Sequence, residues 1–313
     1  ESRPDVVPQV AGLSLKSGNA VLMKGGSEAL NTNRGLVEAI QSGLKSIGVP
    51  AESVQLIESR KEVSDLLQLD EYVSLMIPRG SSEFVKYVKE NTNIPVLGHA
   101  DGVCHMYVHE KADVEMAVDL TVDAKTQYPA VCNAIETLLV DESIAEIYLP
   151  KAAETLRAKQ VELRGCVKTR RIIKAKDASQ EDWAAEYNDL ILSIKVVEDV
   201  NEAILHINEY GSGHTDAIVT RDDAAASLFL ESVDSSSVMH NASTRFADGF
   251  RYGLGAEVGI STNKIHARGP VGLEGLVTYN YRLVGGGHKV AGYCGPDAKK
   301  FLHRETKIKW KKN

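Results

Sequence analysis

Short apolar runs alternate with amphipathic stretches along most of this chain, and this alternation restricts the fold more than any other feature of the sequence. The apolar runs have the length of strands, and the stretches between them place apolar residues at helical spacing. A strand, a crossover helix and a parallel strand form a right-handed unit. The sequence therefore predicts an α/β fold with a parallel sheet and helices on both faces. The predicted strands are 19–24, 54–57, 73–77, 94–97, 190–197, 216–220 and 236–240.

Five other segments have residue patterns that predict a particular local structure. Residues 114–125 are predicted as a helix, and 136–149 as a strand followed by a helix. Charged residues dominate 168–186, which predicts a solvent-facing excursion, and glycine is frequent in 246–275, which predicts mostly loop. Residues 276–284 alternate and predict one last strand. An isolated strand of this kind needs a sheet edge to pair with, in this chain or in another.

The composition is that of a globular protein large enough for two domains. The chain has 313 residues, of which 43% are hydrophobic and 25% charged, and its apolar runs are too short to span a membrane. A net charge of −7 disfavours nucleic acid as a partner, and the basic tail at 307–312 is expected to be solvated. The cysteines form no C-x-x-C pair, which argues against a zinc site or a disulfide framework and fits a reducing compartment. They are Cys104, Cys132, Cys166 and Cys294.

Cys132 is a candidate nucleophile because of the turn predicted around it. It follows Pro129 closely and comes directly before Asn133 and an apolar strand. A thiolate at such a turn can carry an acyl group, and the Cys132 N–H and the Asn133 side chain can face one bound oxygen. The alternative is a buried cysteine that acts only as a small apolar residue, which is the commoner case for an isolated cysteine.

Two strand ends in the first third are candidate cofactor sites. Lys24 and Gly25 follow the first predicted strand, where a lysine reaches a ribose or its phosphate and a glycine admits a ligand to the backbone. Gly80 and Ser81 follow the strand at 73–77 and open a helix, whose first N–H groups attract phosphate. The alternatives are an ordinary turn at the first site and a helix-capping serine at the second. The ordinary G-x-G-x-x-G dinucleotide motif is missing.

Histidines cluster in the segment that follows the strand at 94–97. His99, Asp101, His105 and His109 are close enough in sequence for a metal site to be conceivable. Successive side chains of a strand point to opposite faces, however. We therefore favour structural histidines and expect no metal.

Two arginines in polar segments are candidate anion-binding residues. Arg245 follows a predicted strand and suits a planar carboxylate or phosphate, with a structural arginine as the alternative. For Arg268, which precedes Gly269 and Pro270, we favour the structural interpretation.

Seven stretches of the chain form a distinctive set that extends from residue 1 to about residue 276. They are ESRPDVVPQVAGLSLKSGNAVLMKGG, IPRGSS, GHADGVCHMYV, AKTQYPAVCNAIETLLV, GHTDAIVT, NASTRFADGFRYGLGAEVGIST and HARGPVGLEGL. Together they resemble the γ-glutamyl phosphate reductases, also called glutamate-5-semialdehyde dehydrogenases, a family within the aldehyde dehydrogenase superfamily. The resemblance covers almost the whole chain, and the NASTRFADGFRYGLGAEVGIST stretch is the most specific.

The resemblance implies an activity, which is the NADPH-dependent reduction of γ-glutamyl phosphate to glutamate 5-semialdehyde in L-proline biosynthesis. Cys132 matches the family's catalytic cysteine. Lys24 matches the lysine at the adenosine ribose of the cofactor, and Gly80 and Ser81 match the glycine–serine pair beside its pyrophosphate. Glu186 resembles the glutamate that holds the nicotinamide ribose, and this match is the loosest.

The resemblance also implies how the chain is divided. Residues 1–106 are expected to form part of an NADP-binding domain, 107–262 the catalytic domain with the nucleophilic cysteine, and 263–313 a return to the cofactor domain, an oligomerisation strand and a tail. The superfamily's cofactor domain begins before the point that corresponds to Glu1, so we expect an upstream part of it to be missing. The residues before Glu1 also decide whether a glutamate kinase domain is fused to this one.

One departure from the superfamily concerns the direction of the reaction. Oxidising aldehyde dehydrogenases carry a general-base glutamate in a Leu-Glu-Leu-Gly-Gly-type motif, whereas residues 96–100 of this chain are VLGHA. Without a base that activates water, a thioester survives until hydride arrives, which suits reduction. The alternatives are an oxidising aldehyde dehydrogenase and a non-catalytic fragment that serves as an assembly module.

The expected partners follow from the same resemblance. The substrate is a small molecule, and the chain is expected to form a homodimer or a higher homo-oligomer because the C-terminal strand of the superfamily commonly joins a partner's sheet. Glutamate kinase, separate or fused, is a further expected partner, whereas nucleic acid and membranes are not. A free-standing enzyme is expected in the cytoplasm, and a fused animal-type synthase in mitochondria.

Overall fold

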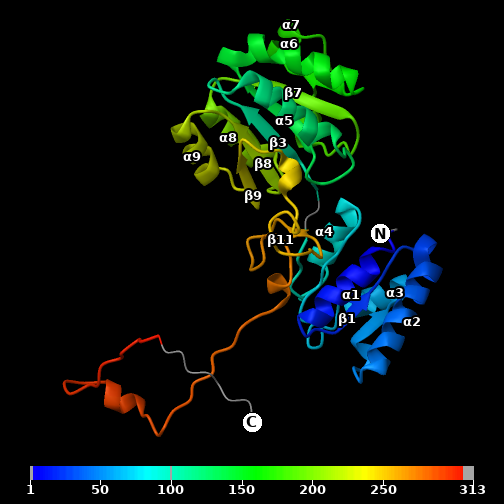
Figure 1. Ribbon diagram of the computed structural model, residues 1–313, viewed down its shortest axis with the longest axis vertical. Coiled ribbons are helices and arrows are strands. Elements are labelled where there is room, and N and C mark those ends of the chain that lie inside the picture. Colours follow the sequence, from blue (N-terminus) through cyan, green and yellow to red (C-terminus); the bar gives the residue numbers. More distant parts are fainter. Residues whose placement is uncertain (1–2, 99–100, 306–313) are drawn as a thin grey trace. The chain divides into compact units, whose positions relative to one another are not determined.

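The middle part of the sequence, residues 104–240, contains a parallel sheet of seven strands (Figure 1). The computed structural model describes residues 3–98 and 101–305 and divides into two compact units, 1–277 and 278–313. In the first unit the strand order is β6-β5-β7-β4-β3-β8-β9, and every neighbouring pair is parallel. The strands are β3 (Cys104–Val108), β4 (Ile135–Asp141), β5 (Glu162–Gly165), β6 (Lys176–Asp177), β7 (Ile191–Val197), β8 (Thr215–Val219) and β9 (Ser237–His240).

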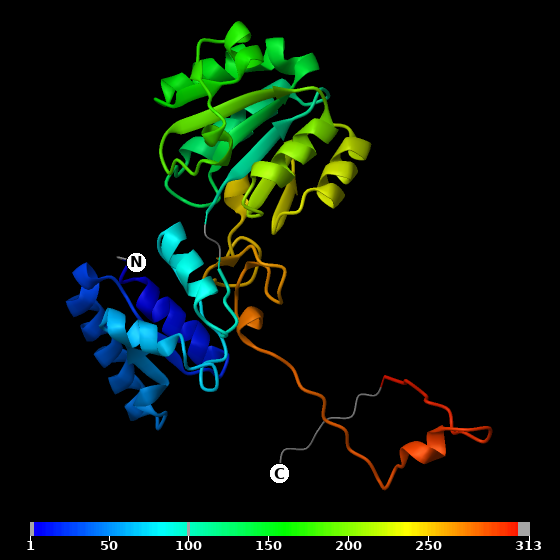
Figure 2. The ribbon, with the colours of Figure 1, turned by 180° about the vertical axis from the view of Figure 1, so that it is seen from behind.

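Helices cover both faces of this sheet, as the sequence predicted. Figure 2 shows α5 and α6 on one face and α8 and α9 on the other. One apolar cluster joins the sheet to α5 and α6, and a second joins it to α8 and α9. The helices are α5 (Val114–Thr126), α6 (Glu142–Ala158), α7 (Val167–Ile172), α8 (Val200–Tyr210) and α9 (Asp223–Ser232). The α/β class and the predicted helix at 114–125 are therefore confirmed.

The central strands are buried because helices cover them from both sides. All seven residues of β4 and all five of β3 are buried, including polar ones. Burying a Leu or Ile side chain stabilises a fold by about 1.5–3 kcal/mol. The buried strands β3 and β4 therefore hold the region around the end of α5, which leads into β4, firmly in place. Candidate site residues at the ends of β3 and β4 therefore rest on a fixed support.

The first third contains shorter strands than predicted. β1 (Val21–Met23) and β2 (Val54–Leu56) pair in parallel, but the predicted strands 73–77 and 94–97 meet only in one parallel bridge, Met76 to Val96. A bridge of this length joins one residue pair, so neither segment forms a ladder. The helices here are α1 (Val6–Lys16), α2 (Leu30–Ser46), α3 (Arg60–Leu66) and α4 (Ser82–Glu90), with 3₁₀ turns η1 (Ser27–Ala29) and η2 (Ala51–Ser53).

The charged segment 168–186 is not simply a solvent-facing excursion. Part of it is helix α7, and β6 adds an edge strand to the sheet beside β5. Within η3 (Glu181–Ala184), Asp182 and Trp183 are buried. Most charged side chains of the segment are exposed, as predicted, but charge composition gives no sign of the edge strand or of the buried Asp182 and Trp183.

The glycine-rich segment 246–275 is mostly loop, as predicted. Its regular structure is limited to the end of η4 (Thr244–Phe246), the antiparallel pair β10 (Ile260–Ser261) and β11 (Gly269–Pro270), and the start of η5 (Glu274–Leu276). This loop region contributes residues to the surroundings of Cys132.

The predicted last strand, 276–284, finds no sheet edge to pair with in the part of this chain that the structure describes. The segment begins in η5 and continues without a ladder partner among the described residues. The side chains of Tyr281 and Leu283 are 91% and 92% exposed. Alternation alone does not make a strand, because a strand is held by hydrogen bonds to a neighbour. The second unit otherwise contains η6 (Val290–Tyr293).

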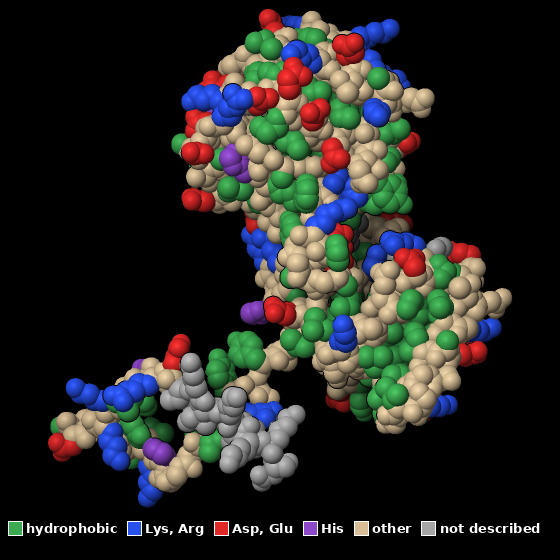
Figure 3. Space-filling model, viewed as in Figure 1, with side chains coloured by type: hydrophobic (Ala, Val, Ile, Leu, Met, Phe, Trp, Pro, Cys, Tyr) green, Lys and Arg blue, Asp and Glu red, His purple; other side chains and the backbone are tan. Residues whose placement is uncertain are grey.

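Charges of both signs are interspersed on the face of the first unit that Figure 3 shows. This distribution agrees with a net charge of −7 and offers no broad basic face there for a phosphate backbone. Over the described residues, each helix is too short or too polar to span a bilayer.

Candidate active site

Cys132 lies in the turn between α5 and β4, at the edge of the sheet from which β4 starts. The turn closes through a hydrogen bond of 2.9 Å from the Ala134 N–H to the Val131 carbonyl. Cys132 is half-buried, and Asn133 after it is buried. The sequence therefore located the turn correctly, and the thiol is neither fully enclosed nor freely exposed.

The segment that enters β3 packs directly against this turn. At Gly102, an added Cβ would lie 2.3 Å from the Cys132 carbonyl oxygen and 2.6 Å from the Cys132 Cα. The buried Cys104 thiol donates to the same carbonyl, with 3.1 Å between Sγ and O. A residue without a side chain is needed at position 102, because only then can the two backbones approach so closely.

The surroundings of Cys132 disfavour its thiolate in the free chain. Burial raises the pKa of the Cys132 thiol to about 12, and the negative charges of Glu186 and Glu257 add to this effect. The Cys132 backbone N–H and the positive charge of Arg79 act in the opposite direction. Two carboxylates and one guanidinium are thus within electrostatic reach of the sulfur.

Asn133 is held by the Ala247 carbonyl and the Thr244 hydroxyl. Its Nδ2 donates to the Ala247 carbonyl at 2.9 Å, and its own carbonyl accepts from the Thr244 hydroxyl at 2.7 Å. These bonds fix the Cys132 turn to η4. The amide that was expected beside a bound oxygen therefore has a structural contact in this state of the molecule.

Arg245 belongs to the same region as Cys132. Its Nε donates to Gln127 Oε1 at 3.0 Å, so it lies beside the end of α5. Burial and the nearby Arg251 lower the pKa of the Arg245 guanidinium, while the charge of Cys132 raises it. An arginine this close to the thiol is placed to neutralise an anionic group of a substrate.

Two of the expected cofactor residues follow β1. Lys24 is exposed and comes directly after the last residue of β1. An added Cβ at Gly25 would lie 2.1 Å from Asn33 Nδ2, so a glycine fits here without moving the Asn33 side chain. A strand end with an exposed lysine and a glycine turn fits a ribose or phosphate group.

The other two expected cofactor residues, Gly80 and Ser81, lie directly before α4. Gly80 has a φ of +151°, which favours glycine, and Ser81 caps α4 by accepting from the Phe84 N–H at 3.3 Å. Ser82 donates to Asp101 at 3.1 Å. The capping role proposed as the alternative for Ser81 is therefore real. It leaves room for a second role, because a helix start has further N–H groups to offer an anion.

Glu186 lies in the loop between η3 and β7. It is half-buried, and its charge contributes to the raised pKa values of both Cys132 and Glu136. Glu186, whose match to the family was the loosest, is thus within electrostatic reach of the Cys132 thiol. Cys132, Glu186 and Arg245 come together in the structure although they are far apart in the sequence.

The histidines in β3 and directly after it have structural partners. His105 Nδ1 lies 2.9 Å from Asp216, and His109 Nδ1 lies 2.8 Å from the Thr220 hydroxyl. His99 lies outside the described residues. Among the residues that are described, no three potential ligands gather as a metal site would require. Arg268 likewise pairs with Asp234, at 3.0 Å, as a structural arginine does.

Sequence reasoning missed three residues that act on Cys132, one on its backbone and two on its thiol. They are Gly102, Arg79 and Glu257. Arg79 donates to the Val258 carbonyl at 2.9 Å, and Glu257 accepts from the Gly249 N–H at 2.9 Å. Arg79 and Glu257 occur in stretches that the sequence analysis had singled out, IPRGSS and GAEVG. Only the fold reveals that both reach Cys132.

Comparison with known proteins gives consistent matches. The aldehyde dehydrogenase family profile matches residues 7–170. The γ-glutamyl phosphate reductase of a Cyanothece species is 61% identical over 305 residues, which are 97% of this chain and 70% of that protein. The enzyme of the same name from a Synechococcus species is 62% identical over 307 residues, covering 97% of this chain and 68% of that protein.

A solved structure agrees with these relatives. The crystal structure of γ-glutamyl phosphate reductase from Thermotoga maritima matches with a TM-score of 0.90 at 47% identity. The match covers 92% of this chain and 70% of that one. The chain thus spans about 70% of the length of the proteins it matches.

Proposed function

The chain belongs to the γ-glutamyl phosphate reductases of the aldehyde dehydrogenase family, and from this premise we propose that it reduces γ-glutamyl phosphate through a thioester on Cys132. The products are glutamate 5-semialdehyde and phosphate, and the step belongs to L-proline biosynthesis. One observation carries the proposal. A half-buried cysteine stands on a turn at the start of a central strand, with Arg245 and two carboxylates within electrostatic reach.

In the first step the Cys132 sulfur attacks the acyl carbon of the substrate. A sulfur–carbon bond forms, the carbon–oxygen bond to phosphate breaks, and phosphate leaves with the electron pair of that bond. Because the thiol is protonated in the free chain, its proton must be taken up as it attacks. Glu257 and Glu186 are candidate acceptors, and burial raises the pKa of Glu257, which improves it as a base.

Backbone and arginine groups then stabilise the negative charge of the reacting molecule. The Cys132 backbone N–H favours the thiolate, and we expect it to donate to the oxyanion, where one such donor typically contributes about 3–4 kcal/mol. Asn133 assists by fixing the turn through Ala247. Arg245 binds the phosphate or the carboxylate of the substrate.

A nicotinamide cofactor, which we propose to be NADPH, fits the residues at the strand ends. Glycine is the suitable residue at both places, because an added Cβ at Gly25 would meet the Asn33 side chain and Gly80 has a φ of +151°. Lys24 and Ser81 would hold the adenosine ribose and pyrophosphate, and Glu186 the nicotinamide ribose. When bound, the cofactor supplies the hydride that converts the acyl group to the aldehyde.

We further propose that the chain works as a homodimer or higher homo-oligomer. The exposed residues Tyr281 and Leu283 lie in a segment of strand-like alternation that has no ladder partner among the described residues. Pairing with the sheet edge of a second copy would satisfy its backbone groups. Glutamate kinase remains a proposed functional partner, because γ-glutamyl phosphate is labile and benefits from direct transfer.

Replacing Cys132 with Ala tests the proposed function. We expect phosphate-dependent reduction of NADP⁺ by glutamate 5-semialdehyde, the reverse reaction, to fall by about 1,000-fold or more. NADPH binding, measured by fluorescence titration, should stay unchanged. Cys166→Ala is the matched control, since this half-buried cysteine lies at the start of α7 and should not affect turnover.

Two results would contradict the proposal. One is a Cys132→Ala enzyme that keeps more than a few per cent of turnover. The other is wild-type turnover that does not depend on phosphate, which would indicate an oxidising aldehyde dehydrogenase that hydrolyses its thioester.

A further inference from the structure

A buried ion pair closes the two ends of the loop that carries Cys132. Lys125 is the penultimate residue of α5, and Glu136 is the second residue of β4. Their side chains are 0% and 1% exposed, and 2.5 Å separates Lys125 Nζ from Glu136 Oε2. The pair therefore sets the span of the Cys132 turn at its base.

The same carboxylate reaches a second segment. Glu136 Oε1 accepts from the Asn188 N–H at 3.3 Å. Asn188 has a φ of +54°, a left-handed conformation that asparagine tolerates better than most residues. It is two residues after Glu186. One buried carboxylate thus touches both the base of the Cys132 turn and the loop of Glu186.

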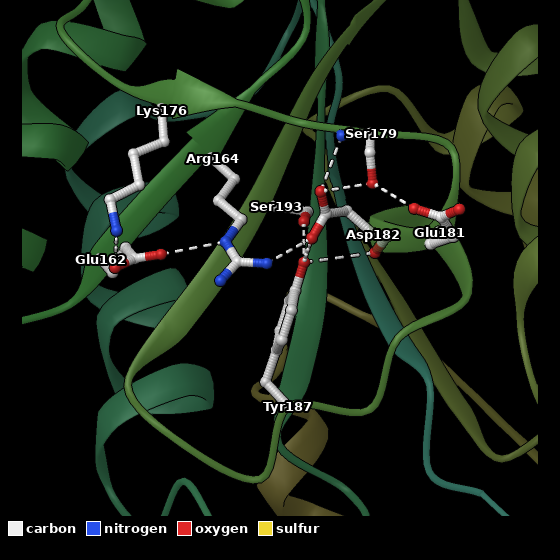
Figure 4. A network of polar contacts seen from close by, with 8 residues as sticks. All are labelled: Glu162, Arg164, Lys176, Ser179, Glu181, Asp182, Tyr187 and Ser193. Carbon is white, nitrogen blue, oxygen red and sulfur yellow. Dashed lines mark hydrogen bonds and ion pairs between the residues drawn. The ribbon is translucent and has the colours of Figure 1, made fainter.

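A polar network holds the Glu186 loop from its other side (Figure 4). The Tyr187 hydroxyl lies 2.6 Å from Asp182 Oδ1 and 2.7 Å from the Ser193 hydroxyl. Arg164 binds Asp182 at 2.6 Å, and its guanidinium lies 5.0 Å from the centre of the Tyr187 ring. Both residues that follow Glu186 are therefore anchored, Tyr187 by this network and Asn188 by Glu136.

Stability does not explain a buried pair at this place. Burial opposes the charged forms, raising the pKa of Glu136 to about 7 and lowering that of Lys125. Replacing a buried ion pair by apolar residues of similar size often leaves a protein equally stable or makes it more stable. Such a pair has its best-supported use in fixing one arrangement of the chain.

We propose that Glu136 is a positioning residue that fixes the Cys132 turn relative to the Glu186 loop, through Lys125 on one side and Asn188 on the other. This proposal rests on the proposed function, since Glu186 is taken to hold the cofactor ribose. Glu136 acts through Cys132 and Glu186 and does not itself touch the reacting groups.

The double variant Lys125→Met/Glu136→Leu tests this role while keeping the core apolar and filled. We expect a Tm within a few degrees of wild type. Alkylation of Cys132 by iodoacetamide, followed by peptide mass spectrometry, should become about fivefold faster because the turn loosens. The KM for NADPH should rise about tenfold and kcat should fall about tenfold.

An exposed pair of the same residue types supplies the control. Lys151 Nζ lies 2.5 Å from Glu115 Oε1 between α6 and α5, with 53% and 76% of the side chains exposed. Lys151→Met/Glu115→Leu should leave the alkylation rate, KM and kcat within about twofold of wild type. A folded Lys125→Met/Glu136→Leu enzyme that behaves like this control would overturn the proposal.

A second variant decides the matter if the double variant does not fold. Tyr187→Phe keeps the ring but removes the hydroxyl contacts to Asp182 and Ser193. We expect the Kd for NADPH to rise about fivefold with a Tm close to wild type. An unchanged Kd would overturn the proposal, since it would mean that loosening the Glu186 loop does not affect cofactor binding. If wild type lacked phosphate-dependent turnover, the proposed function would fail, whereas the alkylation rate of the double variant would still test whether Glu136 positions the turn.

Discussion

The two ends of the proposed active site are built differently. The Cys132 turn rests on β4, whose seven residues are all buried, and Gly102, Cys104 and Asn133 hold it from several sides. The cofactor end rests on β1, which has three residues, and Lys24 there is exposed. From this difference we expect the nucleophile to be positioned before substrate arrives, and the proposed cofactor end to depend more on backbone shape and one exposed charge.

Gly102→Ala is the strongest test of a pre-positioned nucleophile. Its Cβ would lie 2.3 Å from the Cys132 carbonyl oxygen, so the turn must move. Since a misplacement of about 1 Å can cost about 100-fold in rate, we expect kcat to fall by about that factor or more. NADPH affinity should change less than kcat, because the three atoms nearest to the added Cβ all belong to the Cys132 backbone.

The control for this variant is Gly43→Ala. Gly43 is inside α2, and no atom lies within 4 Å of a Cβ added there. An alanine in a helix is more stable than a glycine by about 0.5–1 kcal/mol, so this enzyme should be fully active and slightly more stable. If Gly102→Ala were as active as Gly43→Ala, the turn would not be pre-positioned.

The pH dependence of alkylation separates Cys132 from Cys166. Burial raises the pKa of Cys132 to about 12, so its thiolate fraction should rise about tenfold per pH unit from about pH 7 to about pH 9. Burial also opposes the thiolate of Cys166, but hydrogen bonds from Thr169 outweigh it and lower that pKa. Peptide mapping after iodoacetamide pulses should show the Cys166 rate levelling off first. A Cys132 rate that levels off below about pH 8.5, the pKa of a free thiol, would contradict this account.

Lys24→Met probes the cofactor end and should have the smallest effect on the enzyme. Loss of one charged contact to the cofactor should raise the Kd for NADPH about tenfold. Alkylation of Cys132 should not change, since the charges that shift the pKa of Cys132 most are those of Glu186, Glu257 and Arg79. Fluorescence titration and alkylation of the same preparation check both statements. A changed alkylation rate would mean that the two ends are coupled.

Sequence periodicity predicted the central fold well because its elements are long and buried. The strands at β7, β8 and β9 and the helix α5 lie within a few residues of their predicted bounds. Elements whose existence depends on neighbours were predicted poorly. The segments 73–77 and 94–97 have only one bridge between them, and 276–284 has no ladder partner among the described residues.

The candidate site divides in the same way. The turn at Cys132 and the strand end at Lys24 were predictable because such features are local in sequence, while the roles of these residues stay predictions. The contact of Gly102 with Cys132 was not predictable, because it joins two segments 30 residues apart through their backbones. The bond between Glu136 and the Asn188 N–H joins residues 52 apart. Periodicity carries no information on such contacts, since they arise from how strands are ordered in the sheet.

The most direct measurement is to isolate the acyl-enzyme. The enzyme would be incubated with γ-glutamyl phosphate generated in place by a glutamate kinase and ATP, with no reduced cofactor added, then quenched in acid and digested. The account predicts one added glutamyl group on the peptide that contains Cys132, which disappears when NADPH is supplied before the quench. A glutamyl group on a different side chain, or none on any peptide under conditions where NADPH supports turnover, would contradict it.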